Sequence, residues 1–151
     1  MTIKECLLST FRYNALNFLG RASRKEFIIA TGLYAALNIG LQTILTHNNV
    51  ENSDKVMLLF DIVVLLPFLS LAFRRVHDFG RSAWFFICLG ILAPILCCFL
   101  VSLAILSFYG TNSLLAVTIV NNIIIFLPYS YFMCKKGDAG NNEYGPAPKS
   151  W

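Results

Sequence analysis

The chain has 151 residues, of which 57% are hydrophobic and only 13% are charged, and its mean hydropathy is +0.66. A soluble domain is roughly a quarter charged, and a chain of this length has too little interior to bury so much apolar surface, so a soluble globular protein is excluded. The net charge of +4 is distributed over several segments and forms no single patch, which argues against nucleic acid as a partner.

Four apolar stretches approach or exceed the ~20 residues that a helix needs to cross a bilayer. They cover residues 27–46, 56–73, 83–109 and 114–133. The third is long enough that it must tilt, bend at Pro94 or emerge from the membrane. The pattern predicts an all-α membrane protein in which four transmembrane helices form two tandem helical hairpins.

The basic residues predict the orientation of these spans, because lysine and arginine concentrate in cytoplasmic loops. Of the 12 lysines and arginines, only Lys55 lies in the loops after the first and third spans. Both termini are therefore expected in the cytoplasm. The residues on that side are Lys4, Arg12, Arg21, Arg24, Lys25, Arg74, Arg75, Arg81, Lys135, Lys136 and Lys149.

Residues 1–19 lack the continuous apolar core of a signal peptide. Ile3, Leu7, Phe11 and Phe18 fall on one side of a helical wheel, which predicts a short amphipathic helix on the inner membrane surface. The alternative is an ordinary helix docked on the loops. This segment precedes a four-helix transmembrane domain over 20–136 and a cytoplasmic tail over 137–151 that is rich in glycine, asparagine and proline.

The second and fourth spans resemble each other. The segment DIVVLLPFLSLAFRR from Asp61 aligns without gaps to NIIIFLPYSYFMCKK from Asn122, and Pro67 coincides with Pro128. One interpretation is a duplicated hairpin, whose pseudo-twofold axis would run along the membrane normal. The other is chance likeness between two apolar helices.

Several polar residues lie within the spans at a similar depth. Asn38, Asp61 and Asn122 are each 13 residues from a basic residue bordering their span, which places them ~20 Å from the basic end. An ionisable residue in a span is by default a functional candidate, so this layer can line a substrate or proton path. Alternatively, its members hydrogen-bond helices together. The whole candidate layer is Asn38, Gln42, Asp61, Asn121 and Asn122.

The loop FRRVHDFGRSAW, at Phe73–Trp84, concentrates charge between the second and third spans. Gly80 permits a tight turn, Asp78 can accept hydrogen bonds, and Glu26 is expected to pair with one of the arginines. A His-Asp pair also occurs in metal-dependent phosphohydrolases, but this chain offers no further ligands, and adjacent His and Asp cannot orient each other in a catalytic triad. The sequence therefore predicts no enzyme, no metal and no cofactor.

Three segments resemble the signatures of one bacterial inner-membrane family, known as domain of unknown function 805. They are GRASRKEF, FRRVHDFGRSAW and GDAGNNEYGPAP, which begin at Gly20, Phe73 and Gly137, and the likeness covers nearly the whole chain. The family commonly has glycine at the position of Ala83 and aspartate at that of Ala147. The resemblance implies a small multi-pass protein of the inner (plasma) membrane with its signatures gathered on the cytoplasmic side. It implies no activity.

Two functions remain open. The first is a non-enzymatic module, embedded in the lipid bilayer, that binds an anionic lipid headgroup or another membrane protein at its cytoplasmic face. The alternative is a small transporter or channel, built as a homo-oligomer, that uses Asn38, Asp61 and Asn122. The candidate residues at the cytoplasmic face, which can equally form a structural clasp, are Arg21, Arg24, Glu26, Arg74, Arg75, His77, Asp78, Gly80 and Arg81.

Overall fold

A computed structural model describes residues 2–148 of the chain. Within them the long helices are α2 (Arg24–His47), α3 (Ser53–His77), α5 (Ala93–Tyr109) and α6 (Leu114–Cys134). Before α5, α4 (Ala83–Phe86) continues into a π-helical segment, η2 (Ile87–Leu92), and a 3-10 turn, η3 (Gly110–Ser113), joins α5 to α6. Lys149, counted above among the basic residues, lies outside the described residues.

The predicted all-α fold with four apolar spans is confirmed. The helical stretches long and apolar enough to cross a membrane are Arg24–His47, Ser53–His77, Ala83–Tyr109 and Leu114–Cys134. The second span extends beyond the predicted 56–73 at both ends. The prediction stopped where the apolar stretch ends, but the polar residues on either side are also helical. Pro67 and Pro128 both lie inside their helices, α3 and α6.

The N-terminal helix is present but shorter than predicted. It comprises α1 (Ile3–Leu8) and one π-helical turn, η1 (Ser9–Tyr13), and Thr2 and Glu5 form a capping box at its start. Several large apolar side chains of the first 19 residues are exposed, including Ile3, Leu16 and Leu19. Its position on the membrane surface therefore remains a prediction.

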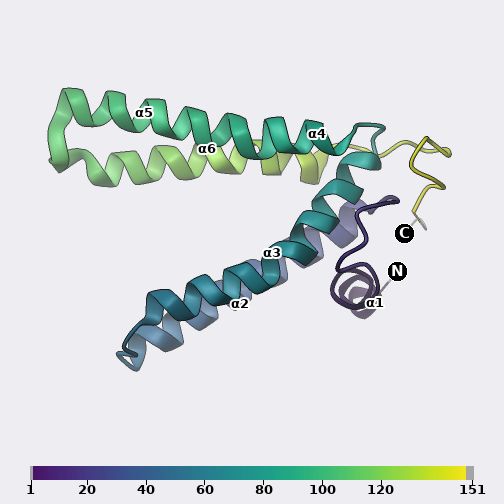
Figure 1. Cartoon of the computed structure of the whole chain (residues 1–151), viewed down its shortest axis with the longest axis horizontal. Helices are drawn as coiled ribbons and strands as arrows, with labels where there is room; N and C mark the ends of the chain where they lie inside the picture. The colour runs from purple at the N-terminus through teal and green to yellow at the C-terminus, as the bar shows by residue number, and fades with distance from the viewer. Residues whose placement is uncertain (1, 149–151) are drawn as a thin grey trace.

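The four spans form two hairpins, α2 with α3 and α5 with α6, as predicted. They do not form a closed bundle. The hairpins meet at the end of the molecule that holds both chain termini and diverge from there, as Figure 1 shows. Few side chains in the most apolar windows of the spans are consequently buried, and in that of α6 none is.

The hydrophobic core lies at this meeting point. It contains side chains from both hairpins and from the loop that joins them, chiefly Phe27, Leu71, Phe79, Phe86 and Phe132. Gly90 in η2 packs against Phe86 and Phe132, where an added Cβ would lie 3.0–3.2 Å from their ring atoms. The loops at the far ends of the hairpins contribute nothing to this cluster. The fold is therefore held together at one end.

Candidate functional site

A buried carboxylate lies where the two hairpins meet. Asp78, at the end of α3, accepts a hydrogen bond from Arg21 Nε at 3.0 Å and another from Arg75 Nη1 at 2.6 Å. All three side chains are at most 5% exposed. Burial raises the pKa of the Asp78 carboxyl, while the charges of Arg75 and Arg21 act to lower it.

Both arginines also bind backbone carbonyl groups. Arg21 donates to the carbonyl oxygens of Gly140 at 2.6 Å and Asp138 at 2.5 Å. Arg75 donates through Nε to the carbonyl oxygen of Phe132 at 2.9 Å and through Nη2 to that of Lys135. These bonds satisfy backbone carbonyl groups at the end of α6 and at the start of the tail, which have no partner within the helix. They fix the tail against the loop after α3.

The tail approaches Asp78 so closely that only glycine fits at position 137. A Cβ built on Gly137 would lie 1.9 Å from Asp78 Oδ2 and 2.6 Å from its Cγ. The carboxylate cannot move aside easily, because Arg21 and Arg75 hold both its oxygens. The contact is further fixed by the Asp138 amide, which donates to the Asp78 carbonyl oxygen at 2.8 Å.

A second buried ion pair ties the N-terminal segment to the hairpins. Arg74 contacts Glu26 Oε1 at 3.3 Å, and both side chains are 4% exposed, which confirms the predicted pairing of Glu26 with an arginine. The same oxygen accepts hydrogen bonds from Ser9 Oγ at 2.9 Å and Thr10 Oγ1 at 3.2 Å. We refer to Arg21, Glu26, Arg74, Arg75 and Asp78 together as the arginine clasp.

The other three candidate residues of the loop, His77, Gly80 and Arg81, have different surroundings. His77 stacks on Tyr144 of the tail, with ring centroids 3.9 Å apart and an interplanar angle of 2°. Gly80 has a φ of +68°, a conformation that favours glycine. Arg81 is exposed and lies over the ring of Phe85. His77 thus contacts the tail through its side chain.

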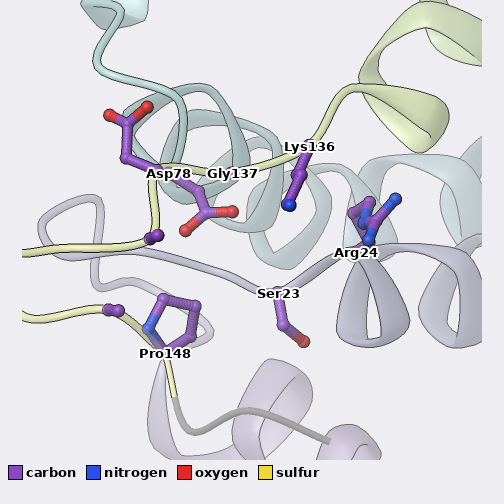
Figure 2. A pocket seen from close by; sticks show the side chains of 9 residues that line it. Ser23, Arg24, Asp78, Lys136, Gly137 and Pro148 are labelled. Atoms are coloured by element: carbon purple, nitrogen blue, oxygen red, sulfur yellow. The ribbon is translucent and has the colours of Figure 1, made fainter.

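A small pocket lies beside the clasp, between the start of α2 and the end of α6 (Figure 2). Its volume is about 280 Å³, and two basic side chains line it, Arg24 from α2 and Lys136 from just beyond α6. Neither forms an ion pair within residues 2–148. We call this the basic pocket; its lining is Ser23, Arg24, Asp78, Lys136, Gly137, Asp138, Ala139, Ala147 and Pro148.

The structure brings only part of the predicted polar layer together. Asp61 Oδ1 on α3 accepts hydrogen bonds from Tyr34 Oη at 2.9 Å and Asn38 Nδ2 at 3.2 Å, both on α2. Asn121 instead binds Ser102 of α5 at 3.0 Å, and Gln42 is exposed one turn beyond Asn38. Each hairpin thus has its own internal polar contact at mid-span.

An open cleft of about 710 Å³ separates the first hairpin from α6. Asp61 lines it from one side and Asn122 from the other. The rest of the lining is mostly apolar and aromatic, with Phe68 on α3 facing α6 residues such as Phe126 and Tyr129. Because the hairpins diverge, this polar pair lies beside an open cleft and not in the interior of a closed bundle.

Several important residues were not identified from the sequence. Gly137, Lys136 and Ser23 are not among the candidate site residues predicted from the sequence. The contacts that give them significance are made by segments far apart in the chain, so local patterns could not reveal them. Among residues 2–148, no group of three His, Cys, Asp or Glu side chains is placed to hold a metal ion.

Comparisons with known proteins agree with the family resemblance found in the sequence. A family model described as "Protein of unknown function (DUF805)" matches residues 15–146. The "Inner membrane protein YhaH" of Escherichia coli (strain K12) is 28% identical over 139 residues, which cover 90% of each chain. The "Inner membrane protein YhaI" of the same strain is 28% identical over 137 residues, 90% of this chain and 89% of the relative. No solved structure matches.

Proposed function

For this chain, which belongs to the family of unknown function DUF805 and is a multi-pass inner-membrane protein, we propose a non-enzymatic role in binding an anionic phospholipid headgroup at the basic pocket. The proposal places both termini and the pocket on the cytoplasmic side, as the distribution of basic residues predicts. A partner protein at the same face is the competing occupant.

The observation that carries this proposal is the division of the basic residues into two groups. Arg21, Arg74 and Arg75 are buried and paired with acids, so they are unavailable to an external ligand. Arg24 and Lys136 come from different hairpins and converge on one pocket without an acidic partner of their own. Of the arginines expected at the binding surface, Arg24 lines the pocket, while exposed Arg81 lies over the ring of Phe85 and does not line it. Lys136, which was not among the expected residues, completes the pair.

The position of the pocket relative to the membrane and its lining side chains both suit a phosphate group. Arg24 precedes the apolar part of α2, which begins at Phe27, so the pocket lies at headgroup level. Arginine offers a planar set of donors to phosphate, lysine offers a point charge, and the Ser23 hydroxyl adds a hydrogen-bond donor. Asp138 is the acid at the pocket rim whose charge opposes an anion; Asp78 is already paired with two arginines.

Lys136→Glu should weaken the binding of phosphatidylglycerol roughly 30-fold. Reversing one charge near a headgroup changes the interaction by about 2 kcal/mol, at ~1 kcal/mol per unit charge. The measurement is the lipid-bound fraction by native mass spectrometry, as short-chain phosphatidylglycerol is titrated into the detergent-solubilised protein.

Lys135→Glu is the matched control for this experiment. Lys135 carries the same charge, but its ammonium group lies over the ring of Tyr131 and does not line the pocket. Equal weakening by both variants would mean that general surface charge attracts the lipid. No weakening by either variant would contradict the proposed function, and a co-purifying protein lost only from Lys136→Glu would identify a protein partner instead.

The alternative, a small oligomeric transporter, is favoured by the cleft and by Asp61 at its edge. Asp61→Asn should leave the fold intact, because the amide oxygen can still accept from Tyr34 and Asn38. If Asp61 carries protons, the same variant should abolish proton flux into liposomes that contain the protein. Flux that is absent from the wild type, or unchanged in Asp61→Asn, would exclude this function for Asp61.

A further inference from the structure

The basic pocket and the cleft lie along the same pair of helices. At the start of α2, Arg24 lines the pocket, and Thr31 lines the cleft two turns later. Near the end of α6, Met133 lines the cleft, and Lys136, two residues beyond the helix, lines the pocket. Residues seven apart on a helix are separated by about 10 Å. The cleft therefore begins next to the pocket and leads away from it into the membrane.

The length of the cleft corresponds to one leaflet of a bilayer. On α6 its lining runs from Met133 to Asn122, a rise of about 16 Å. The hydrocarbon core of a bilayer is ~30 Å thick, so this distance spans about half of it. The polar side chains Asp61 and Asn122 lie at the far end of the cleft, near the midplane, where an acyl chain would end.

The chemistry of the lining changes along this length. The part near the basic pocket is apolar and aromatic, with Phe68 on one wall and Tyr129 and Met133 on the other. The hairpins diverge from the end that holds the clasp (Figure 1), and the cleft between the first hairpin and α6 is open and not enclosed. A lipid chain can thus enter it from the bilayer without passing through the protein.

We propose that the basic pocket and the cleft form one site for a single anionic phospholipid of the inner leaflet. Its phosphate binds Arg24 and Lys136, and one of its acyl chains lies in the cleft between α2, α3 and α6. This inference rests on the proposed headgroup binding and adds the position of the chain. The headgroup supplies most of the affinity, since moving an acyl chain from lipid into an apolar cleft has little hydrophobic driving force.

The test is a photolabelling experiment on the full chain in nanodiscs. The probe is phosphatidylglycerol with a diazirine in the middle of one acyl chain, at a few molecules per disc in a phosphatidylcholine background. Mass spectrometry of the digested protein then locates the label. We expect most of it on the cleft segments of α2 and α6, with several-fold less on the exposed face of α5, which includes Leu96, Phe99 and Leu103.

Two substitutions on neighbouring positions of α2 provide the matched comparison. Ala35 lines the cleft, whereas Ala36 does not, and both are exposed. Ala35→Trp should fill part of the cleft and remove most of the cleft label. Ala36→Trp should leave the label where it is in the wild type. Lys136→Glu should also reduce the cleft label, because the chain is no longer held there by its headgroup.

The outcomes separate this inference from the proposed function. If Lys136→Glu weakens headgroup binding but the label is equal on all exposed faces, the headgroup function stands and the chain position is wrong. If phosphatidylcholine carrying the same diazirine labels the cleft equally well and Lys136→Glu has no effect, ordinary surrounding lipid fills the cleft and both proposals fail. If the cleft of the wild-type protein resists labelling and a separate bifunctional reagent crosslinks two copies through cleft residues, a second copy occupies the cleft, which would also overturn the inference.

Discussion

Asp78→Asn should lower the free energy of unfolding by about 3–5 kcal/mol, the usual effect of removing one partner from a buried ion pair. The cause is the loss of charge opposite two buried guanidinium groups, those of Arg21 and Arg75, which form ion pairs with no other acid among residues 2–148. The amide also presents an NH₂ group to one of them in place of an acceptor. The measurement is equilibrium unfolding of the purified protein in mild detergent.

Asp138→Asn is the control for this variant. Asp138 is an exposed carboxylate nearby whose side chain accepts a hydrogen bond only from Asn142 among the described residues. A surface substitution of this kind should change stability by no more than about 0.5 kcal/mol. If Asp78→Asn and Asp138→Asn have the same small effect, the buried charge pairs do not hold the hairpins together.

Gly137→Ala should destabilise the protein by about 1–3 kcal/mol, as overpacking of a tight site generally does. The backbone of Gly137 has no positive φ, so alanine causes no conformational strain there and the effect is steric. Its Cβ would lie 1.9 Å from Asp78 Oδ2, and either the tail or the paired carboxylate must move. The same unfolding experiment measures the change.

A double-mutant cycle tests whether Gly137→Ala acts through its contact with Asp78. In an Asp78→Ala background the clashing carboxylate is absent, so Gly137→Ala should then cost little. Gly140→Ala serves as the control, because nothing lies within 4 Å of its added Cβ. Additive effects of Asp78→Ala and Gly137→Ala would show that the two sites do not act through this contact.

The sequence predicted the features that depend on the length, composition and spacing of its apolar stretches. The four spans follow from stretches of about 20 apolar residues, and the hairpin pairing follows from short connections between them. The pairing of Glu26 with an arginine was predicted because the loop between the second and third spans concentrates arginines. These are properties of single segments or of neighbours in the chain.

The arrangement of the hairpins could not be predicted in the same way. In lipid, apolar faces gain little from packing on each other, so hydrophobicity does not indicate whether hairpins close into a bundle. The decisive contacts are polar and long-range, such as Arg21 with the tail carbonyls of Asp138 and Gly140. The close approach of Gly137 to Asp78 likewise depends on where the tail returns in space, which no local pattern encodes.

Because the hairpins are fastened only at one end, each behaves mechanically as a lever with a short base and a long arm. The 25 residues of α3 make an arm of about 37 Å. A rotation of about 5° at the base would therefore displace its far end by about 3 Å. The separation between the loops at the two free ends therefore depends strongly on small rotations at the base, where the basic pocket lies.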